Sequence, residues 1–236
     1  MKALILAAGL GSRLSPLTDD IPKCMVKVNG VAIIDKQIQN LIENGINELY
    51  IVTGYKRNVL EMHINEKYSD LNIKIIYNDM YDSTNNMYSL NIARDYLYGQ
   101  EFIMMNSDVF FEEEIIKVLI EEKYSNLIVC QPKSYNEESM KVVVNEGIIT
   151  RISKQIDKTD SYGVSIDIYR FGEETSRKLF DITNEYIYIK KDINSWSEVA
   201  IDDLLKISEF KTLDMQYKWM EIDNIKDLML AEKIFE

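Results

Sequence analysis

Short apolar runs alternate with longer segments of helical spacing through the first half of the chain. Apolar runs bounded by polar residues predict strands buried on both faces. These runs occupy residues 2–8, 48–55, 72–78, 101–108 and 126–131. Apolar residues three or four positions apart predict amphipathic helices over residues 32–45, 58–68, 85–97 and 112–124. Strands that alternate with helices favour a parallel sheet with right-handed crossovers.

From about residue 134 the rhythm changes. Two apolar segments flank Asn145-Glu146-Gly147 and predict a β-hairpin, because such residues accept the tight turn. Further strands are expected at 162–171, 210–215 and 218–223, with helices at 173–181, 198–207 and 225–235. We therefore predict one α/β domain over residues 1–236: a doubly wound, mostly parallel (Rossmann-like) sheet with helices on both faces. A small β-rich insertion in its second half is expected to bind the substrate on which the specificity of the protein depends.

Composition narrows the class of protein. The chain has 236 residues and a net charge of -12, which argues against nucleic acid as a partner, since phosphate backbones need dense Lys and Arg surfaces. Cys24 and Cys130 lack metal-site spacing and fit a reducing cytoplasm. The N-terminal apolar run, about seven residues long, is short for a signal peptide and far short of a membrane span. We expect a cytoplasmic protein without a membrane partner; the oligomeric state is not predicted.

A polar loop follows the first predicted strand. Its Gly9-Leu10-Gly11-Ser12-Arg13 segment can bring backbone N–H groups and a guanidinium to a phosphate. A dinucleotide site would need a third glycine where Leu14 stands and a helix where Pro16 stands, which weakens a nicotinamide oxidoreductase alternative. A turn without a ligand would leave the accompanying Lys23 unexplained.

The segment "LAAGLGSRLSPLTDDIPKCMVKVNG" (6–30) resembles the signature of the nucleotidyltransferase family, roughly L-A-A-G-x-G-[ST]-R-[LM]-x-P-L-T followed by P-K. That family joins nucleoside triphosphates to phosphorylated small molecules and includes sugar-1-phosphate nucleotidylyltransferases and phosphocholine-type cytidylyltransferases. The resemblance implies that Arg13 holds the triphosphate and that Lys23 neutralises the reacting phosphates. It also implies a nucleotide cradle built from Leu6, Ala7, Ala8, Gly9, Gly11 and Ser12. On this basis residues 1–133 form the nucleotide-binding half and residues 134–236 the acceptor-binding half.

Two aspartates follow predicted strands. Asp108 stands where the family has a metal ligand, although Asn106 and Ser107 depart from its usual Gly-Asp. Asp223 ends a later strand, as the family's second metal-binding acid does. Together they imply a Mg²⁺ cofactor, which carboxylate oxygens suit. The alternatives are an anion at a helix N-terminus for Asp108 and a helix cap for Asp223.

Amides at the start of the third predicted helix could recognise a base. Asn85 and Asn86 each offer a donor and an acceptor, and Ser89 lies one turn further on. Helix capping is the alternative for either asparagine. The segment resembles the phosphocholine-type cytidylyltransferases, which implies CTP as the nucleotide, with UTP as the alternative.

The second half should select the acceptor. Lys154 resembles a lysine that holds the acceptor phosphate, and Glu198 and Asp202 could pair with an ammonium group. Met140 and Ile201 stand where choline-specific members have aromatic residues. A zwitterionic or primary-amine acceptor therefore fits better than choline, with Lys141 or Arg151 available for its carboxylate. Trp196 and Trp219 are assigned to packing.

The chain also resembles a branch of this family, from bacterial capsule pathways, that activates phosphorylated glutamine with CTP. We expect transfer of CMP from CTP to such an acceptor with release of pyrophosphate. Phosphocholine and sugar 1-phosphates remain alternative acceptors. A nucleotide-binding regulatory module is disfavoured by the presence of Arg13, Lys23, Asp108 and Asp223, because a pure sensor has no use for a pair of metal-binding aspartates.

Overall fold

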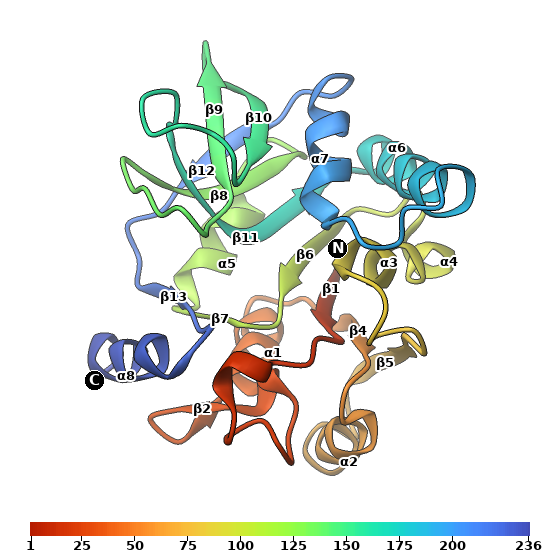
Figure 1. Cartoon of the computed structure of the whole chain (residues 1–236), viewed down its shortest axis with the longest axis vertical. Coiled ribbons are helices and arrows are strands. Elements are labelled where there is room, and N and C mark those ends of the chain that lie inside the picture. The colour runs from red at the N-terminus through yellow and green to blue at the C-terminus, as the bar shows by residue number, and fades with distance from the viewer.

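Four parallel strands form the centre of the computed structural model, which describes residues 1–236 (Figure 1). They lie in the order β6-β1-β4-β5 and pair in parallel throughout. Their bounds are Lys2–Ala7 (β1), Glu48–Thr53 (β4), Asn72–Tyr77 (β5) and Phe102–Asn106 (β6). Helices connect them, as the alternating pattern predicts: α1 (Ile33–Glu43), α2 (Arg57–Lys67), α3 (Asn86–Asn91) and α4 (Arg94–Leu97). The doubly wound, mostly parallel fold is confirmed.

The fifth strand of the first half has different neighbours from those expected. β8 (Leu127–Pro132) does not join β6; β11 (Gly163–Phe171) runs antiparallel between them. β12 (Lys211–Asp214) then pairs in parallel with β8. A continuous apolar run indicates that both faces of a strand are buried, but it does not identify the strands beside it. The expectation that β8 pairs in parallel with the other strands of the first half was therefore wrong. Strands from both halves of the chain therefore share one nine-stranded sheet.

The predicted hairpin is present and extends this sheet. β9 (Lys141–Asn145) and β10 (Ile148–Ser153) pair antiparallel, and β9 also pairs with β11. Glu146 and Gly147 both have positive φ, 51° and 76°, as a type I′ turn requires. In Figure 1 the hairpin forms the upper edge of the molecule.

The remaining elements differ from the sequence pattern in detail. The segment predicted as one helix over 85–97 is divided into α3 and α4. α6 (Glu173–Asn184) continues into a π-helical turn at Glu185–Ile189. The other helices are α5 (Glu114–Glu121), α7 (Ser197–Leu205) and α8 (Ile225–Ile234). Two short sheets, not predicted in this form, pair β2 (Lys27–Val28) with β3 (Val31–Ala32) and β7 (Val109–Phe111) with β13 (Trp219–Glu221).

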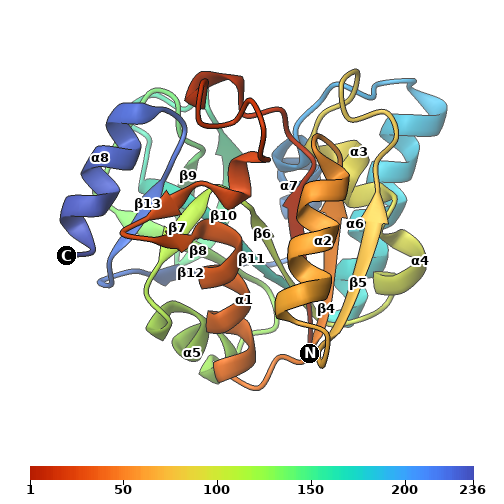
Figure 2. The same cartoon turned by 90° about the horizontal axis from the view of Figure 1, so that it is seen from below.

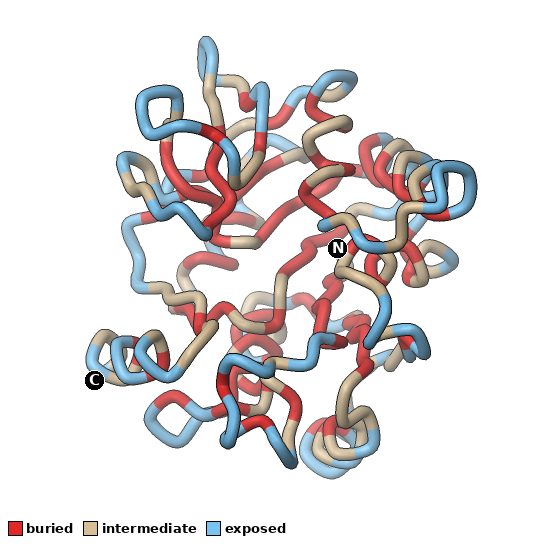
Figure 3. The backbone as a smooth tube through the Cα atoms, in the orientation of Figure 1, coloured by how far each residue is buried: buried red, intermediate tan, exposed pale blue.

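Successive side chains of β1 enter opposite cores, because side chains alternate along a strand. Ala3 and Ile5 pack in a core covered by α1, α2 and α5, which Figure 2 shows on one side of the sheet. Leu4 and Leu6 pack in a second core with residues of α3, α6 and α7. Figure 3 shows the resulting band of buried residues along the central strands. Full burial of each large aliphatic side chain contributes about 1.5–3 kcal/mol, which fixes the strand ends on which the site is built.

A third, smaller core joins the two ends of the chain. Leu14 of the glycine-containing loop packs with Phe110, Ile222 and Leu228. α8 is thereby fixed beside the loop, and residues near 13 and 223 come together although they are far apart in sequence.

Candidate active site

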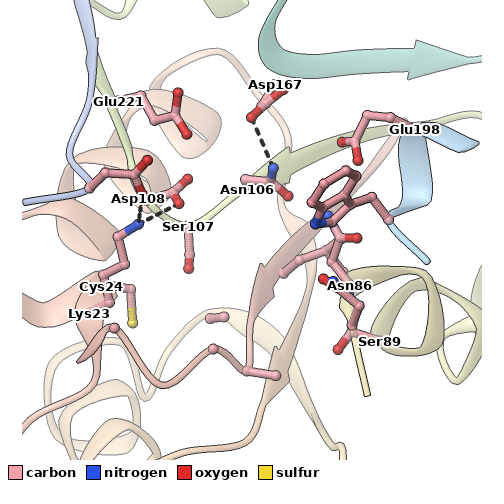
Figure 4. A pocket seen from close by; sticks show the side chains of 18 of the residues that line it. Lys23, Cys24, Asn86, Ser89, Asn106, Ser107, Asp108, Asp167, Glu198 and Glu221 are labelled. Carbon is pink, nitrogen blue, oxygen red and sulfur yellow. Dashed lines mark hydrogen bonds and ion pairs between the residues drawn. The ribbon is translucent and has the colours of Figure 1, made fainter. Parts of the chain in front are cut away.

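A cavity of about 370 Å³ opens at the carboxyl ends of the central strands. This is the edge at which open α/β sheets bind ligands. Residues from both halves of the chain line it, and Figure 4 shows ten of them with labels. The predicted site residues that line this cavity are Leu6, Ala7, Ala8, Gly9, Gly11, Ser12, Arg13, Lys23, Asn85, Asn86, Ser89, Asp108, Lys154, Glu198 and Asp223.

The loop after β1 owes its course to its glycines. Gly11 has φ 64°, and a Cβ atom there would lie 2.8 Å from Cβ of Lys23. The Thr18 hydroxyl donates a hydrogen bond to the Gly11 carbonyl at 2.9 Å, which closes the loop. A Cβ atom on Gly9 would meet nothing within 4 Å, so the backbone there borders open space. The loop therefore holds Lys23 against Gly11 and leaves backbone accessible to a ligand.

Five charged residues gather at one side of the cavity, which we call the Lys23 side: Arg13, Lys23, Asp108, Glu221 and Asp223. The Lys23 ammonium lies 2.7 Å from Oδ2 of Asp108 and 2.7 Å from Oδ1 of Asp223. Nη2 of Arg13 lies 2.7 Å from the same Asp223 oxygen. Burial lowers the pKa of Lys23, but the two carboxylates outweigh it and the pKa is raised. Burial likewise opposes ionisation of Asp223, yet Lys23 and then Arg13 hold its pKa below the usual value.

This side fits a divalent metal ion. Carboxylate oxygens of Asp108, Glu221 and Asp223 lie within 4.8 Å of one another. Oδ1 of Asp108 is buried and has no hydrogen-bond partner, so a lone pair is available inside an all-oxygen donor set. Hard cations such as Mg²⁺ bind such sets. Burial, followed by the charges of the neighbouring carboxylates, raises the pKa of Glu221 to about 9.

Glu221 was missed in the sequence analysis. The available signal was its position two residues before Asp223 in a strand-like segment, since residues two apart share a face. The cap alternative for Asp223 was wrong: Asn224 caps α8, and its side chain accepts hydrogen bonds from the N–H groups of Lys226 and Asp227.

The start of α3 supplies amide and hydroxyl groups. Asn85 is the N-cap, and its Oδ1 accepts from the Asn86 N–H at 2.8 Å. The Asn86 side-chain oxygen accepts from the N–H of Ser197 at 2.8 Å, which leaves its NH₂ as the group able to donate. The Ser89 hydroxyl accepts from the Asn78 amide at 3.1 Å. Asn85 therefore both caps α3 and lines the cavity.

We call a second set of residues that line the cavity the Trp196 side: Met140, Lys154, Asp167, Trp196 and Glu198. The Lys154 ammonium lies 4.8 Å from the centroid of the Trp196 ring. Asp167 accepts hydrogen bonds from the Asn106 amide at 3.1 Å and from the Tyr169 hydroxyl at 3.0 Å. Sequence reasoning assigned Trp196 to packing and did not single out Asp167; both line the cavity.

Two predicted acceptor-binding residues are not among the residues that line the cavity. The Lys141 side chain is buried, and its ammonium donates to the backbone carbonyls of Asn136 at 3.3 Å and Glu137 at 2.9 Å. Oδ1 of Asp202 accepts from the Ile152 N–H at 2.8 Å. Both residues use their charges on backbone groups of the β-rich insertion.

A parallel α/β sheet with a glycine-containing loop, clustered cations and carboxylates at its carboxyl edge defines a nucleotide-binding enzyme. The chain belongs to the nucleotidyl transferase family, whose family model matches residues 2–235. It is a nucleotidyltransferase with cytidylyltransferases among its relatives, and the oxidoreductase alternative is set aside. None of its helices combines the length and apolar character that crossing a membrane requires.

Two curated relatives are informative. The chain is 30% identical over 250 residues to the CTP:phosphoglutamine cytidylyltransferase of Campylobacter jejuni, covering 97% of this chain and 98% of the relative. It is 40% identical over 110 residues to the choline-phosphate cytidylyltransferase of Streptococcus pneumoniae, covering 47% of this chain and 46% of that protein.

Solved structures agree on the fold. The CTP:phosphocholine cytidylyltransferase from Streptococcus pneumoniae superposes with a TM-score of 0.81 at 25% identity, covering 100% of this chain and 99% of that one. The inositol-1-phosphate CTP transferase from T. maritima also gives a TM-score of 0.81, at 20% identity, covering 100% and 96%.

Proposed function

We propose that this protein transfers CMP from CTP to a phosphorylated small molecule, with L-glutamine phosphate as the leading acceptor, and releases pyrophosphate. The product would serve modification of a capsular or other cell-surface polysaccharide. One observation carries the proposal: a single cavity joins the glycine loop and Lys23 to the amides of α3 and to polar residues of the second half. The relative from Campylobacter jejuni, similar over nearly the whole chain, supports this acceptor.

The reaction needs charge neutralisation and positioning more than proton transfer. A phosphate oxygen of the acceptor attacks the α-phosphorus, the bond from that phosphorus to the bridging oxygen breaks, and pyrophosphate leaves. The nucleophile is already an anion, so no general base is required. Consistently, no histidine lines the cavity, and His63 instead pairs with Asp35 at 2.7 Å. In this proposal Arg13 and Lys23 bind the phosphates and hold the reacting atoms in line.

We assign the cofactor site to Asp108, Glu221 and Asp223, whose oxygens suit Mg²⁺. The ion, when bound, would neutralise negative charge on the phosphates. Lys23 lies between two of these carboxylates, so its ammonium can turn from them to a phosphate oxygen placed beside them.

For the base, we assign recognition to Asn85, Asn86 and Ser89. The NH₂ of Asn86, which also lies within hydrogen-bond reach of Glu198, can donate to the carbonyl oxygen or the ring nitrogen acceptor of cytosine. For the acceptor phosphate, we assign Lys154, a cation that lines the cavity. Phosphocholine is the second candidate acceptor, because the choline-phosphate enzyme of Streptococcus pneumoniae shares 40% identity over about half of the chain.

A substrate screen tests the proposal. Four nucleoside triphosphates are crossed with L-glutamine phosphate, phosphocholine and glucose 1-phosphate, and pyrophosphate release is measured with Mg²⁺ present. We expect the highest kcat/KM for CTP with L-glutamine phosphate, by at least about tenfold, the step that 1.4 kcal/mol represents. Turnover with CTP and phosphocholine alone would overturn the acceptor but keep the cytidylyltransferase. Turnover only with UTP and the sugar phosphate would overturn both.

A further inference from the structure

Two carboxyl groups on the Trp196 side share a single hydroxyl partner. The Tyr169 hydroxyl lies 3.0 Å from Oδ1 of Asp167 and 3.2 Å from Oε1 of Glu198. Neither carboxyl group takes part in any ion pair of the structure. Both residues line the cavity, and Glu198 is only 3% exposed. A buried carboxyl pair without a cation is costly unless a ligand provides one.

The hydrogen bonds around the pair leave acceptor capacity unused. Tyr169 has one hydroxyl proton and can donate it to only one of the two carboxyl groups at a time. Asn106 adds one amide donor to Oδ2 of Asp167. The Ser165 hydroxyl donates to the Tyr169 oxygen and not to either carboxyl group. Glu198 has further donors around it, namely its own N–H, the Ser197 hydroxyl and the Asn86 amide. The lone pairs that remain for N–H donors of a ligand are therefore mainly those of Asp167.

The pKa values of the two carboxyl groups agree with a shortage of donors around the pair. Burial, and then the charge of Glu198, raises the pKa of Asp167 to about 8. Burial also raises the pKa of Glu198. A ligand cation beside the pair would favour the ionised forms and offset both effects.

The aromatic ring on the Trp196 side already has a cation of the chain beside it. Recognition of a quaternary ammonium group relies on aromatic faces, because that group has no N–H to donate. Here the Trp196 ring has the Lys154 ammonium 4.8 Å from its centroid. The other walls of the Trp196 side are Met140 and the two carboxyl residues. These surroundings favour a cation that donates hydrogen bonds over one that stacks on rings.

We propose that Asp167, acting with Glu198, receives the ammonium group of the acceptor and makes the enzyme prefer a primary ammonium to a quaternary one. The inference rests on the proposed transfer to a phosphorylated acceptor. It assigns Asp167 as a specificity-determining residue and narrows the acceptor class to phosphorylated primary amines and amino acids. A primary ammonium offers three donors to the unused carboxylate lone pairs, whereas a trimethylammonium offers none.

The backbone at Asp167 makes a clean substitution possible. Asp167 has φ 58°, at a point where the register of β11 against β8 shifts. Asparagine tolerates this left-handed conformation about as well as aspartate does, whereas most side chains do not. Asp167→Asn therefore removes the charge while keeping the backbone and the shape of the side chain. The matched control is Asp160→Asn, at an exposed aspartate in the same half of the chain.

Phosphoethanolamine and phosphocholine form the test pair, because they differ only in the three methyl groups on nitrogen. Pyrophosphate release with CTP gives kcat and KM, and calorimetry with a non-reactive CTP analogue gives the Kd of each acceptor. We expect the wild type to prefer phosphoethanolamine by about tenfold or more. Asp167→Asn should raise KM and Kd for phosphoethanolamine about tenfold, with those for phosphocholine and CTP within about twofold. Asp160→Asn should behave as wild type.

Equal losses for both acceptors in Asp167→Asn, or a wild-type preference for phosphocholine in Kd, would overturn the inference. Absence of turnover with every acceptor would instead overturn the proposed function. In that case the ratio of the two Kd values still decides the role of Asp167.

Discussion

The two sides of the cavity balance charge in opposite ways. On the Lys23 side, Lys23 and Arg13 pair with Asp108 and Asp223 within the chain. On the Trp196 side, Asp167 and Glu198 have no cation from the chain, and the nearby lysine lies over an aromatic ring. The part of the site that would meet any nucleoside triphosphate thus supplies its own cations, and the part that would meet the acceptor requires one from the ligand. Substitutions on and beside the two sides can break or sharpen this contrast.

The largest effect is expected from Lys23→Ala. It removes the cation that we assign to the reacting phosphates, and loss of one such group commonly costs about a hundredfold to a thousandfold in kcat. Pyrophosphate release at saturating substrate measures the loss, and thermal unfolding should show a much smaller change in stability. Lys27→Ala, at an exposed lysine of β2, is the control. Wild-type turnover in Lys23→Ala would remove the lysine from the reaction.

Glu221→Gln should weaken metal binding on the Lys23 side. It keeps the size of the side chain and removes one charge from the three-carboxylate set, for which we expect at least about a tenfold loss of affinity. Titration with Mn²⁺, followed by calorimetry or by the paramagnetic signal of the ion, measures this without turnover. Glu66→Gln on the exposed face of α2 should not alter it. Unchanged Mn²⁺ affinity in Glu221→Gln would show that Glu221 is not a metal ligand and that only Asp108 and Asp223 hold the ion.

Asp167 predicts a dependence of stability on pH, and Glu221 on the Lys23 side, whose pKa is also raised, adds to it in the same direction. The pKa of Asp167 is about 8 in the folded chain against an ordinary value of 3.8, so between these values the folded state holds a proton that the unfolded state has lost. Stability should therefore fall as pH rises through this window. Relative to Asp167→Asn, the wild type should lose more than about 1 kcal/mol of unfolding free energy between pH 5 and pH 8, since one pKa unit corresponds to about 1.4 kcal/mol. Parallel denaturation curves for the two proteins would contradict the shifted pKa.

The smallest effect is expected from Asp202→Ala. The carboxylate of Asp202 accepts from the Ile152 N–H, so its loss should cost about 1 kcal/mol of stability and leave the acceptor KM unchanged. Trp196→Ala, which removes a wall of the cavity, should raise the acceptor KM instead. An altered KM with unchanged stability in Asp202→Ala would return this aspartate to the acceptor site.

The Lys23 side could be predicted well from the sequence, because most of its chemistry is local. The glycines, Arg13 and Lys23 occupy one loop whose spacing is itself a motif, and Asp108 directly follows an apolar strand. Helices and strands could also be read from apolar spacing, although β8 could not be placed beside β11 in this way. Interruption of a helix after Asn91 likewise leaves no clear trace in the spacing.

The Trp196 side could not be predicted to the same degree, because its members come from separate elements. In the sequence, Asp167 looks like an ordinary polar residue of a strand. Only the structure shows its unusual backbone, with φ of 58° at the register shift of β11. From the sequence, the charge of Lys141 was predicted to bind a ligand. In the structure the side chain is buried and its ammonium donates to backbone carbonyls instead. Burial and pairing of such residues depend on contacts between elements.

The position of β11 bears on any attempt to divide the protein. Both strands that flank β8 follow it in the sequence, and β6 would lose its partner on one side without β11. A fragment ending at residue 133 would expose an unpaired strand and an open sheet edge, features that invite aggregation. The residues to which we assign acceptor preference therefore do not form a detachable module. Chimaeras between relatives should exchange side chains within an intact sheet rather than join halves at that point.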